Sequence, residues 1–264
     1  MKLTGNTIFI TGGGTGIGRG LAEALHKRGN QVIISGRRKG SLDATTKANP
    51  GMRSVELDIS DSENIAGVAK KLIADNPALN VLINNVGVMQ IDDAAEKIDD
   101  RLLTSTVATN LLGPIRLTSA LIEHLKRQPK ATIIYNTSAL AFVPLALTAV
   151  YSSTKAALHS YVLSQRYKLK ATSVSVLEIA PPWVQTDLLN SNDEPRAMPL
   201  KEFIEGTIKV LGTDAKRSWS NRRSLSETTP DRMRARSQSL AGSAGTWGPG
   251  CSNRRFQPAV NSLV

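Results

Sequence analysis

The chain has 264 residues, 41% of them hydrophobic, which suffices for the core of one α/β domain. Its single cysteine, Cys251, excludes a disulfide framework and thiolate metal sites and favours a cytoplasmic protein. No signal-peptide pattern opens the chain and no apolar run approaches the roughly 20 residues that span a bilayer, so exported and membrane-spanning classes are excluded. The net charge of +11 would suit nucleic acid, but residues 216–264 carry +7 of it, so the rest of the chain is only mildly basic.

Short β-branched runs alternate along the chain with longer segments of helical period, which is the pattern of repeated βα units. The predicted strands are residues 7–10, 31–35, 53–57, 80–83, 132–136 and 173–179, and the predicted helices are residues 17–28, 61–75, 101–127, 151–169 and 199–211. Parallel strands that are buried on both faces should be almost continuously apolar, and the runs Thr-Ile-Phe-Ile, Gln-Val-Ile-Ile and Val-Leu-Ile meet this requirement. We therefore predict a single-domain α/β fold with a doubly wound, Rossmann-like parallel sheet, whose ligands bind at the carboxyl ends of the strands.

A glycine-rich turn, TGGGTGIG at residues 11–18, follows the first predicted strand and leads directly into a helix. Glycine is needed where the backbone takes a positive φ or approaches a ligand closely, and the following helix N-terminus offers free N–H groups to a pyrophosphate. A purely structural turn is the alternative. The predicted dinucleotide-binding residues here are Gly12, Thr15, Gly16, Ile17 and Gly18.

The second predicted strand ends in SGRR at residues 35–38, where an NAD-preferring site carries an acidic residue for the adenosine ribose. No carboxylate is present in this segment. Gly36 leaves room for a 2′-phosphate, and Arg37, together with Arg38, can donate charge-assisted hydrogen bonds to it, so we predict NADP as the cofactor. The alternative is that both arginines are solvated surface residues.

Asp58 follows the third predicted strand. Its carboxylate is expected to accept a hydrogen bond from the adenine amino group. Helix capping by Asp58, Ser60 or Asp61 is the alternative.

Several further motifs occur in the order found in the short-chain dehydrogenases/reductases, which the chain resembles over about residues 5–190. The resemblance extends to a bacterial branch of that family named after a D-alanine/lipoteichoic-acid operon. The matching residues are Thr11-Gly12-x-x-x-Gly16-x-Gly18, Asn84-Asn85-Val86-Gly87 with valine for the usual alanine, Asn110, Ser138 and Tyr151-x-x-x-Lys155.

Tyr151 and Lys155 are four residues apart in a predicted helix, so they share one face. A nearby ammonium favours the phenolate and should bring the pKa of Tyr151 down from its usual value near 10, toward the range where an alcohol proton moves. Tyr151 is therefore the predicted general acid/base. An ordinary amphipathic helix start is the alternative interpretation.

The resemblance implies the remaining roles. Lys155 would bind the nicotinamide ribose, Ser138 would steady the substrate oxygen, and Asn110 would hold a water that relays protons to Lys155. Further cofactor-binding residues implied by the family are Asn85, Gly87, Pro181, Val184 and Thr186, although Pro182 replaces the glycine that the family carries in this segment. A small-molecule carbonyl or alcohol substrate is implied, as is a homo-dimer or homo-tetramer unless the altered C-terminal part prevents it.

Other titratable residues do not form a predicted site. The histidines His26, His124 and His159 lack metal-ligand spacing and are expected to be surface or packing residues, so no metal is predicted. The carboxylates Asp92, Asp93, Asp99 and Asp100 are expected to be solvated helix and loop charges.

The composition changes at about residue 213, after which Ser, Arg, Gly and Pro dominate. We predict a short-chain dehydrogenase-like domain over residues 1–212 and a disordered or frameshifted Arg/Ser-rich tail over residues 213–264. The frameshift hypothesis arises because residues 217–232 can be encoded by DNA whose neighbouring frame reads ILVEQAQSLRDNAGP, an amphipathic continuation that resembles the tail of the same bacterial branch. The gene sequence decides it.

The predicted function is hydride transfer between NADP(H) and a carbonyl or secondary alcohol. A cofactor-binding protein with impaired or no turnover is the alternative, because Pro182 and the altered tail could spoil the substrate pocket. Nucleic-acid binding by the Arg-rich tail is a weaker third hypothesis, since aromatic stacking residues are few there. The sequence does not identify the substrate.

Overall fold

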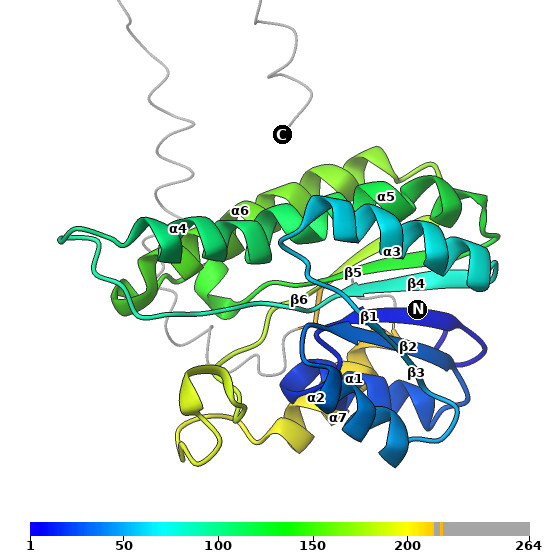
Figure 1. The fold of residues 1–264 in the computed structure, drawn as a ribbon, viewed down its shortest axis with the longest axis horizontal. Helices are drawn as coiled ribbons and strands as arrows, with labels where there is room; N and C mark the ends of the chain where they lie inside the picture. The colour runs from blue at the N-terminus through cyan, green and yellow to red at the C-terminus, as the bar shows by residue number, and fades with distance from the viewer. Residues whose placement is uncertain (214–216, 219–264) are drawn as a thin grey trace, which may run out of the picture. The chain divides into compact units, whose positions relative to one another are not determined.

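A parallel β-sheet forms the centre of the computed structural model, which describes residues 1–213 and 217–218 (Figure 1). The strand order is β3-β2-β1-β4-β5-β6-β7, and every pair is parallel. The order reverses between β1 and β4, which creates the crevice where a doubly wound sheet binds its ligands. The strands are β1 Thr7–Thr11, β2 Gln31–Gly36, β3 Arg53–Glu56, β4 Leu79–Asn84, β5 Ala131–Asn136, β6 Val174–Ile179 and β7 Arg217–Ser218.

Helices cover both faces of the sheet (Figure 1). One face carries α1 Gly16–His26, α2 Lys39–Ala48 and α7 Leu200–Leu211, and the other carries α3 Ser62–Asp75, α4 Asp100–Val107, α5 Gly113–Arg127 and α6 Ala149–Lys168. The fold is therefore the predicted three-layer, doubly wound α/β arrangement.

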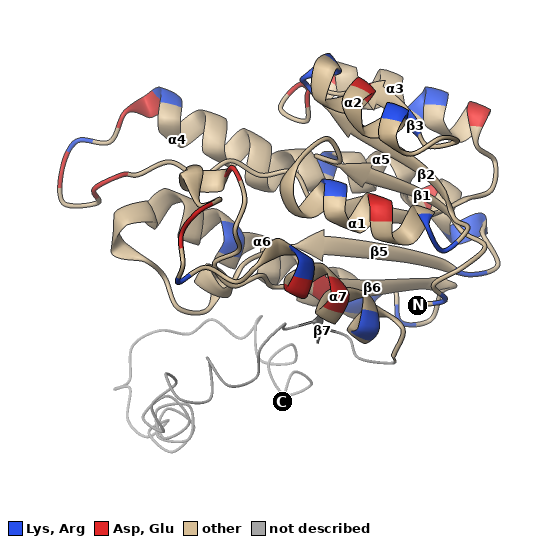
Figure 2. Cartoon of the chain, turned by 90° about the horizontal axis from the view of Figure 1, so that it is seen from below, with Lys and Arg blue, Asp and Glu red and all other residues tan. Residues whose placement is uncertain are grey.

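Each face of the sheet packs against its own helices through a separate apolar cluster. Phe9 and Ile133 face the cluster under α3, α5 and α6, while Ile8 and Ile134 face the cluster under α1 and α7. Neighbouring strand residues thus serve opposite layers, which explains why β1 and β5 are buried at every position. Figure 2 shows the complement of this pattern, with charged residues on helices and loops and none on β5.

Three elements differ from the prediction. The helix α2 was not predicted, because within it only Leu42 and Thr45 are buried and its apolar period is weak. The predicted helix over residues 101–127 is interrupted by a π-helical turn, η1 Ala108–Leu112, between α4 and α5. The short strand β7 pairs with Glu178 and Ile179 at the sheet edge, beyond the predicted domain boundary.

The chain divides into two units, Met1–Ser220 and Asn221–Val264. Apart from Thr213 and β7, the predicted tail lies outside the described residues, and its boundary stays a prediction.

Candidate active site

One cavity of about 780 Å³ lies at the carboxyl ends of the strands. Its walls come from the segments after β1, β2, β4, β5 and β6 and from the start of α6. Most of the predicted site residues line it together: Gly12, Thr15, Gly16, Ile17, Gly18, Arg37, Arg38, Asn85, Gly87, Ser138, Tyr151, Lys155, Pro181, Val184 and Thr186. Asp58 and Asn110 lie outside this lining.

The glycine turn requires glycine at the predicted positions. Gly12 and Gly16 have φ values of 68° and 53°, which other residues rarely adopt. A Cβ added at Gly18 would come within 2.1 Å of the Gly12 carbonyl oxygen. Gly13, which was not among the predicted residues, is also constrained, because a Cβ there would meet the Ile34 side chain at 2.5 Å.

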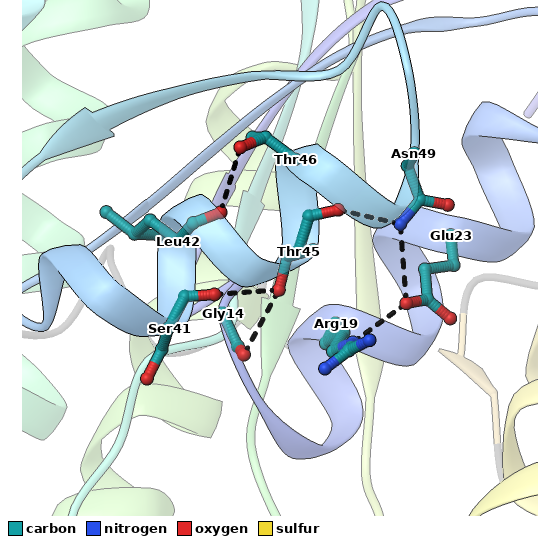
Figure 3. A network of polar contacts seen from close by, with 8 residues as sticks. All are labelled: Gly14, Arg19, Glu23, Ser41, Leu42, Thr45, Thr46 and Asn49. Carbon is teal, nitrogen blue, oxygen red and sulfur yellow. Dashed lines mark hydrogen bonds and ion pairs between the residues drawn. The ribbon is translucent and has the colours of Figure 1, made fainter.

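The helix α2 anchors the glycine turn from behind (Figure 3). Thr45 Oγ1 donates to the carbonyl oxygen of Gly14 at 3.3 Å and to that of Ser41 at 2.9 Å. The Asn49 amide links the same helix to Glu23 on α1, at 3.5 Å. An element that the sequence analysis missed therefore fixes the path of the turn.

Arg37 and Arg38 lie where β2 ends, at the glycine-turn end of the cavity. Both side chains are exposed, and Arg38 Nη2 donates to Thr15 Oγ1 at 3.4 Å. The two arginines and Gly36 line the cavity side by side. This end of the cavity is therefore cationic and open enough for an anionic group.

Asp58 lines a second, small cavity of about 40 Å³ together with Gly36 and Arg37. Its Oδ1 accepts from the Ser60 amide at 2.9 Å and from Ser60 Oγ at 2.6 Å. These hydrogen bonds, helped by the charge of Arg37, lower the pKa of Asp58. Of the three capping candidates, Asp61 is the N-cap of α3, and it accepts from two backbone amides.

Asn85 joins the ends of β4 and β1 at the crevice. Its Nδ2 donates to the Thr11 carbonyl oxygen at 3.0 Å, and its Oδ1 accepts from Asn136 Nδ2 at 2.8 Å. Asn136, at the end of β5, was not predicted, since a strand-terminal asparagine gives little signal by itself. It connects the glycine-turn end of the cavity with the Tyr151 end.

Tyr151 and Ser138 lie together at the other end of the cavity. Both side chains are buried, each 7% exposed, and they form a hydrogen bond. Burial raises the pKa of Tyr151 to about 12, although the hydrogen bond from Ser138 acts in the opposite direction. The prediction that this pKa falls is therefore wrong, because desolvation of the buried phenolate dominates.

Lys155 is also buried, and Nζ lies 5.5 Å from the centre of the Tyr151 ring. The Nζ atom donates to the carbonyl oxygen of Asn136 at 2.9 Å. Burial lowers the pKa of Lys155 to about 8. A Cβ built on Gly87 would lie 3.5 Å from this Nζ, so the lysine head faces the segment after β4.

Asn110 is fully buried in the π-helical turn η1. Its Oδ1 accepts from the Val88 amide at 2.8 Å, and its Nδ2 donates to the Val88 carbonyl oxygen at 2.8 Å and to Thr154 Oγ1 at 3.3 Å. The side chain therefore holds the segment after β4 against α6. The water relay through Asn110 stays a prediction.

Asp92 corrects the expectation of a solvated carboxylate. The residue is 9% exposed, and its two carboxylate oxygens accept from the Ala149 and Val150 amides at 2.9 and 3.0 Å. These are the first amides of α6, the helix that carries Tyr151, so Asp92 caps that helix. Its distance of 58 residues from Val150 in the chain gave no sequence signal.

The segment after β6 forms the last wall of the cavity. The Pro181 carbonyl oxygen accepts from the Ala139 amide at 2.8 Å, and Thr186 Oγ1 accepts from the Leu188 amide at 3.3 Å. Trp183 donates its indole N–H to Ser191 Oγ at 2.8 Å. Pro182 is accommodated in the cavity wall next to these bonded residues.

The histidines are packing residues, as expected. His124 is buried and bonds to the Leu79 carbonyl oxygen, while His159 Nδ1 lies 2.9 Å from the fully buried Glu178 carboxylate. Within residues 1–213 and 217–218, no cluster of His, Cys, Asp or Glu could hold a metal. The helices of this described part also include none that is long and apolar enough to cross a membrane.

Comparison with known proteins places the chain in a family. Residues 6–197 match the family described as short chain dehydrogenase. An uncharacterized oxidoreductase of Bacillus subtilis, DltE, is 40% identical over 71% of this chain and 75% of its own length. An NADPH-dependent 1-acyldihydroxyacetone phosphate reductase of Schizosaccharomyces pombe is 32% identical over 76% of this chain and 65% of its own.

A solved structure extends the comparison to the fold. A short chain dehydrogenase from Burkholderia cenocepacia in complex with NADP superposes with a TM-score of 0.78 at 26% identity, covering 94% of this chain and 100% of that one. The similarity to DltE confirms the predicted bacterial branch. The chain therefore belongs to the short-chain dehydrogenase/reductase family of oxidoreductases.

Proposed function

We propose that this protein transfers hydride between NADP(H) and a carbonyl or secondary alcohol, with Tyr151 as the general acid/base. The observation that carries the proposal is the convergence of Tyr151, Ser138 and Lys155 at one end of a cavity whose other end is a glycine turn. These groups come from β5, α6 and β1, and the sheet brings them to the same edge.

The residues fit a dinucleotide. The turn at Gly12, Gly16 and Gly18 packs tightly on itself, since a Cβ at Gly18 would collide with the Gly12 carbonyl oxygen, and the free N–H groups at the start of α1 suit a pyrophosphate. Gly87 leaves the head of Lys155 accessible from the cavity, where it would bind the nicotinamide ribose. When bound, NADPH supplies the hydride that reduces the carbonyl carbon and is itself oxidised to NADP⁺.

The preference for NADP(H) over NAD(H) follows from the end of β2. Arg37 and Arg38 are the charged residues of this cavity end, and no carboxylate follows β2 directly to hold ribose hydroxyls. The relative from Schizosaccharomyces pombe is described as NADPH-dependent, and the Burkholderia cenocepacia protein was solved with NADP, which supports the same choice.

Tyr151 acts as the proton donor in reduction. With a pKa of about 12, its phenol is protonated at neutral pH and can donate to the carbonyl oxygen as the C=O electron pair moves onto that atom. Ser138, which bonds to Tyr151, would donate its hydroxyl proton to the same oxygen in a hydrogen bond and orient the substrate. In the oxidative direction the phenol would first lose its own proton by way of Lys155 and the water at Asn110, and the resulting phenolate would then accept the alcohol proton.

Lys155 stabilises the phenolate that remains after proton transfer. Its ammonium is close to the Tyr151 ring and is bonded to Asn136, so the positive charge is fixed near the phenol. Because the pKa of Lys155 is about 8, the amine is protonated in most molecules at neutral pH. The water relay would then return a proton from solvent by way of Asn110 and Lys155.

The test is NADPH oxidation over a panel of ketones and aldehydes, with Tyr151→Phe as the variant. The phenylalanine keeps the ring and its packing but removes the acid, and positioned acid/base catalysis contributes about 10²–10⁴-fold, so we expect turnover to fall by at least that range. NADPH affinity should change little. Lys155→Met should weaken both turnover and NADPH binding. A Tyr151→Phe protein that reduces its substrate at a near-normal rate would contradict the mechanism, and NADPH binding without any turnover would favour a binding protein.

A further inference from the structure

Exposed apolar side chains form part of the lining of the cavity. Six large apolar side chains line the cavity and are each more than a third exposed: Ile91 67%, Leu147 61%, Trp183 44%, Leu145 43%, Leu188 37% and Leu189 37%. These six, which we call the apolar mouth, make up more than half of the eleven large hydrophobic residues that are exposed in the described part of the chain. Exposed apolar side chains that line one cavity indicate a ligand that covers them.

One half of the apolar mouth is held by α6. The Asp92 amide donates to the Leu147 carbonyl oxygen at 3.0 Å, which fixes Ile91 next to Leu147. The Asp92 carboxylate is bonded to the first amides of α6, and the Leu145 amide donates to Ser152 Oγ at 3.3 Å. The position of these apolar side chains is therefore fixed relative to the helix that carries Tyr151.

The other half is held by a buried serine. Ser191 is 1% exposed, and its Oγ accepts from the Trp183 indole N–H at 2.8 Å and donates to the Leu188 carbonyl oxygen at 2.8 Å. The Ser191 amide donates to the Thr186 carbonyl oxygen at 3.0 Å. Leu189 has a positive φ of 53°, a conformation that is uncommon for a leucine and that this set of bonds maintains.

The charges around the cavity disfavour an anionic substrate at this side. The cationic lining residues of the described chain are Arg37 and Arg38, at the glycine-turn end, and Lys155, which is buried and bonded to Asn136. The charged residue next to the apolar mouth is Asp187, an exposed carboxylate that would repel a carboxylate or phosphate.

We propose that the substrate is an uncharged ketone or aldehyde, or the corresponding alcohol, that carries an extended alkyl chain, and that the chain lies in the apolar mouth. This inference rests on the proposed function. The reaction is ketone plus NADPH plus a proton giving the secondary alcohol plus NADP⁺, with the proton delivered by Tyr151. The carbonyl lies at Ser138 and Tyr151, and the chain extends away from the glycine-turn end of the cavity.

The test is a series of methyl ketones from 2-butanone to 2-decanone, assayed with NADPH, and 9-oxodecanoate as a charged analogue. Burial of a methylene is worth about 0.8 kcal/mol, so kcat/KM should rise by about threefold to fourfold per added methylene until the mouth is filled. The carboxylate analogue should be a poorer substrate than 2-decanone. Leu147→Ser should reduce the slope with chain length, whereas Leu163→Ser, which changes an exposed leucine of α6 outside the cavity, should leave it unchanged.

A second measurement separates this inference from the proposed function. The affinity of the same ketones for the Tyr151→Phe protein saturated with NADPH is measured by calorimetry, which needs no turnover. Affinity that rises with chain length supports binding of the alkyl chain in the apolar mouth, even if the unmodified protein turns over none of the ketones. Such a lack of turnover would contradict the proposed function but not this inference. Two results would overturn the inference: rates and affinities that do not depend on chain length, or a preference for 9-oxodecanoate. The proposed function would still stand in either case if other carbonyls were reduced in a Tyr151-dependent reaction.

Discussion

At the end of β2, two neighbouring arginines differ in their surroundings. Arg38 donates a hydrogen bond to Thr15, while Arg37 lines both the main cavity and the small cavity of Asp58. Arg37 is therefore better situated to meet a 2′-phosphate between Gly36 and Asp58. The carboxylate of Asp58 is close enough for the charge of Arg37 to affect its pKa.

We expect the unmodified protein to bind NADPH more tightly than NADH, and Arg37→Ala to remove most of that preference. A charge-assisted hydrogen bond is worth about 1.5–3 kcal/mol, which corresponds to roughly a 10- to 150-fold ratio of affinities. Calorimetric Kd values for both cofactors measure the ratio. Arg38→Ala is the matched control and should have the smaller effect. Equal affinities for the two cofactors in the unmodified protein would refute the assignment.

Burial gives Lys155 a distinct effect on stability. Its pKa falls from 10.5 to about 8 in the folded chain, so between these values the unfolded chain binds more protons. Stability should then rise with pH across that window, because the cost of burying the ammonium is fully present below about pH 8 and disappears as the lysine becomes neutral in both states. The opposite effect of Tyr151, whose pKa is raised to about 12, begins only above pH 10.

We compare the free energy of unfolding of the unmodified protein with that of Lys155→Met. This difference should increase by about 2 kcal/mol in favour of the unmodified protein from pH 8 to pH 10, since one pKa unit equals about 1.4 kcal/mol. Urea unfolding at several pH values gives the difference. The exposed Lys201 provides the control, and Lys201→Met should give a difference that does not vary with pH. A flat difference for Lys155→Met would show that the buried lysine does not titrate in this range.

Most individual site residues could be predicted from the sequence, because motifs of fixed spacing follow the strand ends. Tyr151, Ser138 and the glycines lie where the sequence analysis expected them. Asn136 and Asp92 could not be predicted, because each acts through partners that are distant in the chain, Asn85 in one case and the first amides of α6 in the other. The pKa of Tyr151 could not be predicted either, since it depends on burial.

At the scale of elements, central strands such as β1 and β5 were predictable because burial on both faces makes them continuously apolar. The helix α2 escaped prediction because it buries little apolar surface, and it is tied instead by hydrogen bonds such as that from Thr45 to Gly14. The π-helical turn η1 was missed because the apolar period continues through it, although Gly113-Pro114 directly after it is a sequence signal for an interrupted helix. It holds Asn110 against Val88 and Thr154.

The start of α6 depends on a single carboxylate from another segment. Asp92 accepts from the amides of Ala149 and Val150, and α6 carries both Tyr151 and Lys155. Negative charge at a helix N-terminus is favourable, and loss of a cap costs about 0.5–2 kcal/mol. The capping contact therefore contributes both to stability and to the position of the proposed acid/base.

We expect Asp92→Ala to lower the free energy of unfolding by about 1–2 kcal/mol, because two buried amides lose their partner. The rate of carbonyl reduction should also fall, with a smaller change in NADPH affinity, since the glycine turn is untouched. Chemical denaturation and steady-state kinetics measure the two effects. Asp93→Ala changes an exposed neighbour and should be close to neutral. If the two variants behaved alike, the cap would be of no consequence.

At the scale of the whole molecule, the residues that line the main cavity within the described part of the chain all precede Asn190. After α7, which ends at Leu211, the described chain adds the two-residue strand β7 at the edge of the sheet, next to β6. A strand this short contributes few ladder hydrogen bonds. The sequence beyond it is rich in Ser, Arg and Gly.

We therefore expect a chain truncated after Ala215 to bind NADPH with an unchanged Kd, because no cavity-lining residue is removed. A second truncation, after Ser220, keeps β7 and separates the contribution of that strand from that of the remaining tail. The Tm of the shorter chain should be slightly lower, since β6 loses its edge partner, while the longer one should match the full chain. Thermal unfolding and NADPH titration of all three proteins measure this. If only the chain ending at Ala215 failed to fold, β7 would be part of the essential sheet; if both truncated chains failed, residues beyond 220 would be needed for folding and the predicted domain boundary would be wrong.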